Sequence, residues 1–136
     1  MAWACLLDTR DVAARISAPR HILVLDGAAG PWIPAGFDVV TQRGDGLGER
    51  LAAAFADTFA SGTCPAALVI AMDTPHVCAG TVEAALDALD GGAASVLGPA
   101  LDGGFWAIGL QRGYDPAAVF DGIPMSTPRT GAAQRA

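Results

Sequence analysis

Two short, largely apolar runs constrain the fold of this chain more than any other feature of its sequence. Residues 21–25 read HILVL and residues 67–72 read ALVIAM, and the aspartates Asp26 and Asp73 follow them directly. The run at 67–72 has no polar position, which is typical of a strand that is buried on both faces. Such strands occur mainly in parallel sheets covered by helices, so the sequence predicts an α/β domain.

Helical patterns separate the predicted strands. Between residues 47 and 60, leucine and phenylalanine recur every four residues, which predicts one apolar helix face. The tail from residue 115 is mixed and shows no long element. We expect three layers around a mostly parallel sheet, with ligands bound at the carboxyl ends of its strands. The predicted helices span 3–16, 47–60 and 79–90, and the predicted strands span 21–25, 37–41, 67–72, 95–97 and 105–110.

Length and charge exclude several classes of function. The 136 residues suffice for a single domain over 1–136, the net charge is −6, and every cation is arginine. An acidic chain without a basic cluster argues against nucleic acid and anionic membranes as partners. No apolar run approaches a membrane span and no signal-peptide pattern is present, so we expect a cytoplasmic protein. Cys5, Cys64 and Cys78 match no metal or redox spacing and predict reduced, mostly buried thiols.

The first candidate site is the glycine-rich turn from Gln42 to Arg50, which leads into the helix at 47–60. Free N–H groups at a helix start favour an anion or the polar edge of a ligand, and glycines allow the backbone to approach it closely. The pattern is neither a Walker loop nor GxGxxG. A plain strand-to-helix turn with Asp45 as its N-cap is the more economical interpretation.

The second candidate is Asp73, which ends an apolar strand at the edge where ligands are expected. One carboxylate there can take a Mg²⁺ or Mn²⁺ ion that also bridges two phosphates. A turn or helix cap explains the residue equally well. A transition-metal site formed by Asp73, His76 and Cys78 is a weaker alternative.

The third candidate is Asp102, which precedes Gly103 and Gly104. The segment fits a type I′ hairpin turn. It also fits a base or second metal ligand, with the two glycines leaving space for a substrate. Only one of the neighbouring Phe105 and Trp106 can face the ligand side, because adjacent strand residues point to opposite faces.

Five segments in order resemble the bacterial nucleotide-diphospho-sugar transferase-like family, which has a glycosyltransferase-A fold. Its members are also described as a domain of unknown function or as radical-SAM/selenodomain-associated transferases. The resemblance implies a three-layer, Rossmann-like fold of this type. The segments are VLDGAAGPW at 24–32, QRGDGLGERLAAAF at 42–55, MDTPHV at 72–77, LGPALDGGFWAIGL at 97–110 and PMSTPRTGA at 124–132.

The resemblance also implies roles for individual residues. Asp73 would hold the Mg²⁺ or Mn²⁺ ion in place of an Asp-x-Asp motif, and Asp73 and Asp102 would be catalytic. The residues implied for nucleotide binding are Gln42, Gly44, Asp45, Gly46, Gly48 and Arg50. Those implied for the acceptor side are Gly103, Gly104, Ser126 and Thr127. From the residues alone, Ser126 or Thr127 as a helix N-cap is the better interpretation of the 124–128 segment.

Two departures from the family pattern qualify this picture. Family members usually start with a strand and a Lys-x-Pro-x-x-Gly-x-x-Lys-Thr-Arg-Leu loop, and they continue to an acidic segment near the C-terminus; neither is found in this sequence. The resemblance therefore implies a partial domain that lacks a strand between those at 21–25 and 67–72. Those two strands would then pair directly, accept another partner or leave a poorly stable domain, and their open edges could support self-association.

The resulting hypothesis is a metal-dependent transferase that moves a sugar from a nucleotide-diphospho-sugar to an acceptor. Two alternatives stay open. A nucleotidyltransferase would use a similar sheet and a strand-end aspartate to act on a nucleoside triphosphate. A non-catalytic remnant would bind a partner chain or nothing.

Overall fold

The computed structural model describes residues 2–72 and 78–121. Helices α2 and α3 and strands β1 and β2 have the predicted bounds. The helix predicted at 3–16 and the strands predicted at 67–72, 95–97 and 105–110 differ by one or two residues at their ends, where assignments commonly vary. The short helix α4 was not predicted. The order is α1 (Ala2–Arg15), β1 (His21–Leu25), β2 (Phe37–Thr41), α2 (Leu47–Ala60), β3 (Ala66–Ile70), α3 (Ala79–Asp90), β4 (Ser95–Pro99), β5 (Phe105–Gln111) and α4 (Pro116–Phe120).

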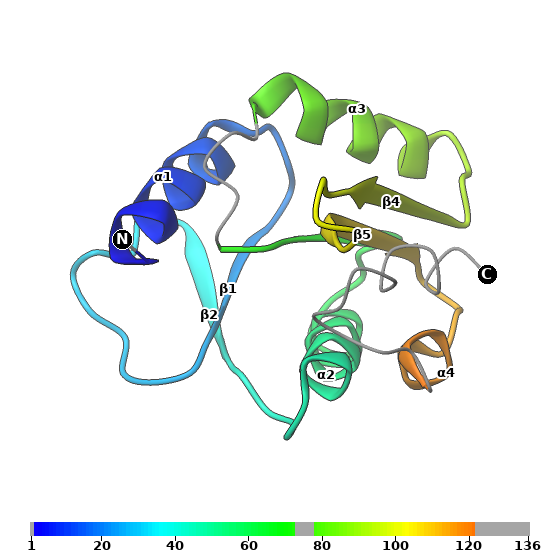
Figure 1. Cartoon of the computed structure of the whole chain (residues 1–136), viewed down its shortest axis with the longest axis horizontal. Coiled ribbons are helices and arrows are strands. Elements are labelled where there is room, and N and C mark those ends of the chain that lie inside the picture. Colours follow the sequence, from blue (N-terminus) through cyan, green and yellow to red (C-terminus); the bar gives the residue numbers. More distant parts are fainter. Residues whose placement is uncertain (1, 73–77, 122–136) are drawn as a thin grey trace.

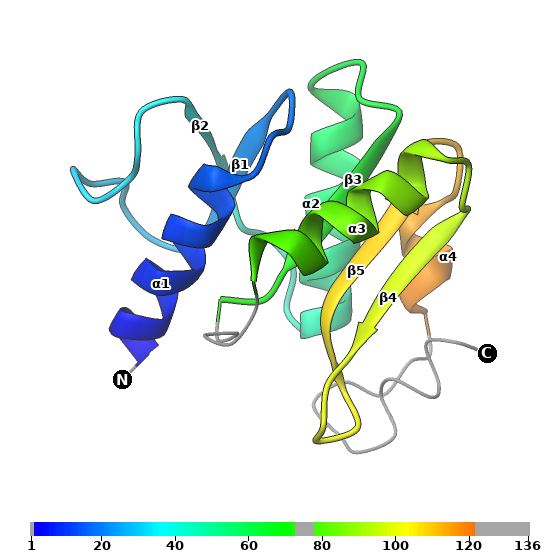
Figure 2. The same ribbon diagram turned by 90° about the horizontal axis from the view of Figure 1, so that it is seen from above.

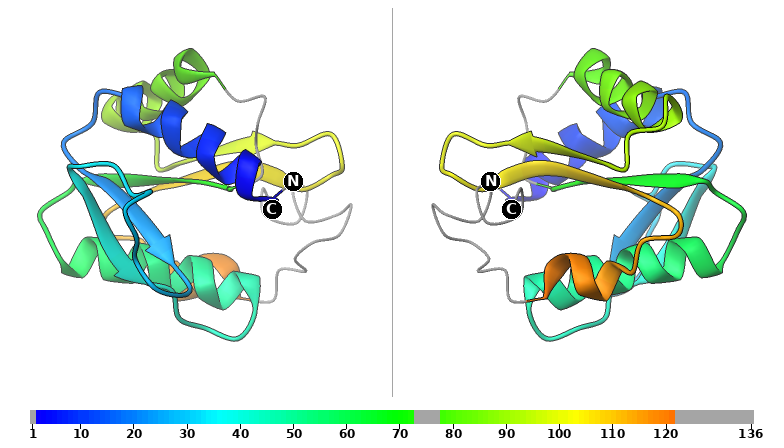
Figure 3. Two further views of the ribbon diagram at one scale, coloured as in Figure 1. Left: turned by 90° about the vertical axis from the view of Figure 1, so that its left-hand side faces the viewer. Right: turned by 90° about the vertical axis from the view of Figure 1, so that its right-hand side faces the viewer.

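The elements form three layers, as the sequence predicts. Figure 1 shows α1 and α3 on one side of the strands and α2 and α4 on the other. The side views of Figure 3 show the same arrangement.

The strands form two sheets rather than one mostly parallel sheet. β1 and β2 are parallel, whereas β5 lies between β3 and β4 and is antiparallel to both. The prediction of a mostly parallel sheet is therefore wrong. A tight turn over residues 100–104 joins β4 to β5, and such a turn can connect only antiparallel neighbours because a parallel pair needs a long crossover.

β1 and β3 do not pair with each other. Within the described residues, β1 pairs only with β2, and β3 pairs only with β5. Direct pairing, one of the outcomes expected for a chain that lacks the strand between them, is thus not what the structure shows.

The main hydrophobic core lies between the three-stranded sheet and the helices α2 and α4. Phe55 is fully buried, Phe59 is nearly so, and both pack with Phe120 of α4. The predicted apolar face of α2 is confirmed for its later turns. Leu47 in the first turn is 46% exposed, so this face opens towards solvent where the helix begins.

The cysteines are free, but none is buried. Cys5 and Cys64 are half-buried and Cys78 is exposed, which corrects the expectation of mostly buried thiols. In the described segments, no helix has both the length and the apolar character needed to cross a membrane.

Candidate functional site

The turn between β2 and α2 is held in a conformation that only glycine adopts easily. Gly44 has φ +115°, and a Cβ atom there would lie 2.8 Å from the backbone nitrogen of Arg50. The Arg50 guanidinium donates to the Gly44 carbonyl oxygen at 3.3 Å. The turn therefore folds back onto the start of its own helix.

Gly46, not Asp45, caps α2. Gly46 is extended, with φ −105° and ψ 168°, and provides no side-chain hydrogen bond to the helix start. The expected Asp45 cap is therefore wrong. Instead, Glu49 reaches back and accepts a hydrogen bond from the Asp45 backbone N–H at 2.9 Å. This resembles half of a capping box, in which an acidic residue three positions after the cap bonds back to the preceding backbone.

An ion pair fastens the turn to the body of α2. Arg43 donates two hydrogen bonds to the Asp57 carboxylate, at 3.1 and 2.8 Å. These bonds lower the pKa of the Asp57 carboxyl and raise that of Arg43. Sequence analysis did not single out this pair, because residues fourteen positions apart meet only once the chain reverses at the turn.

The remaining residues predicted to bind a nucleotide lie along the same turn. Gln42 is half-buried, and its backbone N–H donates to Leu25 of β1 at 2.9 Å, which continues the pairing of β1 with β2. Gly48 lies in the first turn of α2. Asp45 and Arg50 are exposed, and no hydrogen-bond or ion-pair partner of the Asp45 carboxylate is found among the described residues.

Asp102 shapes the turn that joins β4 to β5. Its Oδ1 atom accepts a hydrogen bond from the Gly104 N–H at 2.9 Å, and Gly103 has φ +90°. Ala100 and Gly104 close the loop over residues 101–103. This is a hairpin loop longer than the type I′ turn that the sequence suggested. The carboxylate is exposed, and one of its oxygens is already engaged in holding the turn.

The structure brings these two turns to one end of the molecule. Figure 2 shows the start of α2, the β4–β5 turn and the carboxyl end of β3 at the same end. The side views of Figure 3 agree. Asp73, Ser126 and Thr127 lie outside the described residues, so their predicted roles stay predictions.

Two threonines that the sequence analysis missed make hydrogen-bond contacts near the predicted site, one in α1 and one in α3. Thr9 of α1 is 7% exposed, and its hydroxyl lies within hydrogen-bond distance of two carbonyl oxygens, those of Cys5 at 2.8 Å and Met72 at 3.1 Å. Thr81 lies in the first turn of α3, where its hydroxyl is 3.1 Å from Cys78 Sγ and lowers the pKa of that thiol. A buried threonine in a helix has no sequence signal that distinguishes it from an exposed one.

The adjacent aromatic residues face opposite sides, as expected for a strand. Trp106 packs towards α3, where its ring fills the space beside Gly98. Phe105 packs against the core formed with α2 and α4. The two aromatic rings therefore lie on opposite faces of β5.

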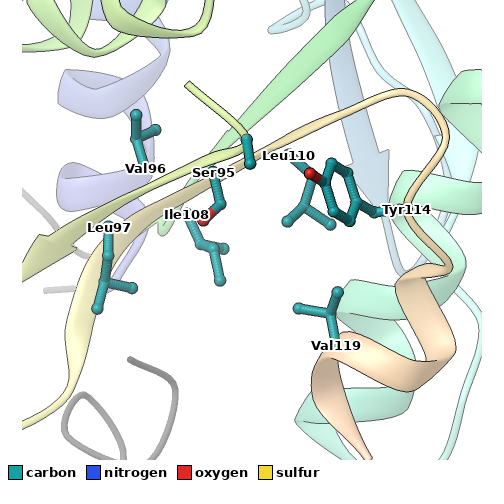
Figure 4. A pocket seen from close by; sticks show the side chains of 8 residues that line it. Ser95, Val96, Leu97, Ile108, Leu110, Tyr114 and Val119 are labelled. Atoms are coloured by element: carbon teal, nitrogen blue, oxygen red, sulfur yellow. The ribbon is translucent and has the colours of Figure 1, made fainter. Parts of the chain in front are cut away.

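Two cavities lie away from the predicted site residues. One of about 390 Å³ is formed under α3 beside Trp106. The other, of about 300 Å³, lies beside α4. Figure 4 shows Leu97 and Ile108 pointing from the sheet towards the side where Val119 lies. Neither cavity is lined by residues 42–50 or 102–104, and both linings are mainly apolar.

The described residues contain no cluster of side chains that could bind a metal ion by itself. Over residues 2–72 and 78–121, no three histidine, cysteine, aspartate or glutamate side chains converge. The alternative site of Asp73, His76 and Cys78 includes two residues outside the description.

Comparison with known proteins places the chain in a family. Residues 8–127 match the family described as "uncharacterized protein conserved in bacteria (DUF2064)". The chain belongs to the DUF2064 family. No curated protein matches this DUF2064 chain.

A solved structure shares the fold of this DUF2064 chain. It is a 1.90 Å crystal structure from Desulfovibrio desulfuricans G20, described as a "putative nucleotide-diphospho-sugar transferase". The two are 27% identical and superpose with a TM-score of 0.80. The match covers 98% of this chain and 62% of the other, so this chain spans less than two thirds of that relative.

Proposed function

We propose that this protein is a transferase that uses a nucleotide-diphospho-sugar as the sugar donor. The observation that carries the proposal is the match, over 98% of the chain, to a structure described as a transferase of that kind. The position of the turn before α2 supports it, because this turn follows the carboxyl end of β2, which is parallel to β1, and ligands bind at such ends in parallel sheets.

The turn before α2 suits the nucleoside part of the donor better than the bare diphosphate. Glu49 already places a carboxylate at the Asp45 N–H, and a second anion there would be repelled. Arg43 is engaged with Asp57. The exposed Asp45 carboxylate can accept hydrogen bonds from ribose hydroxyls or from base N–H groups. The neighbouring Gly46 has no side chain, and the space at its Cβ position is open.

The diphosphate then requires another source of positive charge. In this proposal Asp73 would hold a Mg²⁺ or Mn²⁺ ion, which would supply the positive charge that stabilises a leaving diphosphate. Asp102 lies on the acceptor side, and the carboxylate oxygen not bonded to Gly104 orients or deprotonates the acceptor hydroxyl.

The first test is binding of UDP, GDP, CDP and ADP to the chain by calorimetry, with and without Mn²⁺. We expect saturable binding of at least one diphosphate that weakens at least about tenfold in Asp73→Asn. Asp87→Asn, an equivalent change on the exposed side of α3, serves as the matched control and should bind as the parent does. Equal affinity of Asp73→Asn and the parent would remove the metal role from this residue.

The second test identifies the reaction by its products. A sugar transferase releases a nucleoside diphosphate from a nucleotide sugar, whereas a nucleotidyltransferase releases pyrophosphate from a nucleoside triphosphate. Absence of saturable nucleotide binding under all conditions would instead favour a non-catalytic protein. This outcome has to be tested because the chain covers only 62% of the solved relative.

A further inference from the structure

We infer that the cavity under α3 binds the apolar part of the acceptor, and that this part is a neutral group of one or two rings. The inference rests on the proposed function and adds the chemical class of its acceptor. The α3 cavity has a volume of about 390 Å³, within the range of about 300–1,000 Å³ that is common for small-molecule sites. Its described lining comes from the first half of α3, from β3, and from the adjoining ends of β4 and β5.

The first observation is where the α3 cavity lies along the chain. Pro99 directly precedes the turn over residues 100–104, Trp106 follows that turn two residues later, and both line the cavity. Asp102 does not line it, but its turn connects the two strand ends that do. A molecule in the cavity is therefore held beside the turn that carries the residue proposed to engage the acceptor hydroxyl.

The second observation is that α3 covers the sheet unevenly. Val82 and Leu89 of α3 are only 2% and 1% exposed, so this side of the helix packs closely. Thr81 and Ala84 line the cavity and are exposed, and Trp106 on the opposite wall is half-buried. The cavity is therefore open to solvent along α3, so a ligand can enter it and cover apolar surface that the protein leaves accessible.

The third observation is the fit between Gly98 and the Trp106 ring. A Cβ atom at position 98 would lie 2.5 Å from the nearest atom of this ring, closer than any real contact allows. The ring can therefore lie against the backbone of β4 only because residue 98 is glycine. In this position the ring forms one wall of the cavity, and an aromatic wall favours a flat ligand that stacks against it or meets it edge to face.

Size and charge then define the ligand. An apolar cavity of about 150 Å³ is large enough for benzene, so the α3 cavity has room for one or two rings. No charged side chain belongs to the part of its lining that the structure describes. A charged group on the ligand would lose its hydration there without gaining a partner, which is costly. The part of the acceptor that enters the cavity is therefore neutral, and the acceptor hydroxyl points out towards Asp102.

The test measures binding of 2-naphthol, a neutral two-ring alcohol, to the full chain by calorimetry. We expect saturable binding that weakens at least about tenfold in Ala84→Leu, because the larger side chain occupies the cavity. Ala88→Leu is the matched control, since Ala88 is an exposed alanine one turn later in α3 that does not line the cavity. Gly98→Ala should also weaken binding, because it displaces the Trp106 ring. Circular dichroism checks that each variant folds, and leucine is nearly as favourable as alanine in a helix.

Two comparisons make the result specific. Naphthalene-2-sulfonate has the same rings with a negative charge and should bind at least about tenfold more weakly than 2-naphthol. Equal affinity for the two probes, or equal loss of affinity in Ala84→Leu and Ala88→Leu, would overturn the inference. A saturating nucleoside diphosphate should leave the affinity for 2-naphthol undiminished, because donor and acceptor occupy different places. Competition between them would show that the probe binds at the nucleotide turn, which would also overturn the inference.

The outcomes separate this inference from the proposed function, because 2-naphthol binding is measured without a nucleotide. Saturable nucleotide binding together with no binding of 2-naphthol would overturn the inference and leave the proposed function standing. Binding of 2-naphthol without binding of any nucleotide would contradict the proposed function and remove the acceptor role from the α3 cavity. Binding of both, with the expected effects of the variants, would support the two together.

Discussion

Gly44 is the residue on which the candidate nucleotide turn depends most directly. Its φ of +115° is unfavourable for any residue with a Cβ atom, and that atom would also approach the Arg50 nitrogen to 2.8 Å. We expect Gly44→Ala to lower the free energy of unfolding by about 2 kcal/mol, measured by urea denaturation. Gly46→Ala is the control, because Gly46 is extended and has open space around its Cβ position. Equal stability of the two variants would show that the turn relaxes at no cost.

Cys78 is the cysteine expected to react fastest with alkylating reagents. It is exposed, and hydrogen bonding with Thr81 lowers the pKa of its thiol, so the reactive thiolate forms at a lower pH than in an ordinary cysteine. Iodoacetamide labelling followed by peptide mass spectrometry should modify Cys78 before the half-buried Cys5 and Cys64. In Thr81→Val the labelling profile of Cys78 should move to higher pH. An unchanged profile would mean that the Thr81 hydroxyl does not stabilise the thiolate.

At the scale of elements, Thr9 joins α1 to the end of β3. Its buried hydroxyl is within hydrogen-bond distance of the Met72 carbonyl, and valine would leave that oxygen without this donor. We expect Thr9→Val to destabilise the protein by about 1 kcal/mol in urea denaturation. Thr9→Ser keeps the hydroxyl and should lose less. If serine costs as much as valine, the contribution of Thr9 comes from the packing of its methyl group.

The elements themselves could be predicted from the sequence because their patterns are local. The four-residue repeat in α2 identified Phe55 and Phe59 as core residues, and both are buried. The direction of β5 could not be found in the same way. Nothing local in a short apolar run distinguishes a parallel from an antiparallel neighbour, and the length of the 100–104 connection decides it. Likewise, the sequence predicted that Asp45 caps α2, whereas in the structure Glu49 is the acidic residue that bonds to the turn. The sequence does not separate the two, because either acidic residue suits a helix start.

The candidate site was predicted only to the level of segments. The sequence identified the two glycine-rich turns, and the structure brings both to one end of the molecule. It did not identify Arg43 and Asp57, or the contact of Thr9 with Met72, because these depend on how the segments fold back on one another. The position of Asp73 stays a prediction, since the residue lies outside the described segments.

At the scale of the whole molecule, the free edges of the two sheets differ in how well they resist association. The outer edges belong to β2 and β4, and the inner edges belong to β1 and β3. On β2, the exposed Asp38 pairs with Arg20, and on β4 the strand ends at Gly98 and Pro99 with an irregular register. Charges, proline and irregular pairing are the usual means of protecting an edge. The edges of β1 and β3 carry none of these features, since apart from His21 their residues are apolar. Self-association should therefore use the inner edges.

This difference predicts how the protein behaves as its concentration rises. Sedimentation velocity of the unmodified chain should show a growing fraction of dimers or larger species, because the unpaired β1 and β3 edges find partners in other molecules. Val24→Lys adds a charge to β1 and should reduce association, whereas Val39→Lys adds the same charge to β2, where valine is already 44% exposed, and should leave it unchanged. Circular dichroism checks that both variants fold. Equal suppression by the two lysines would show that net charge, rather than an open edge, controls association, and a monomer at every concentration would mean that the inner edges are protected from other molecules.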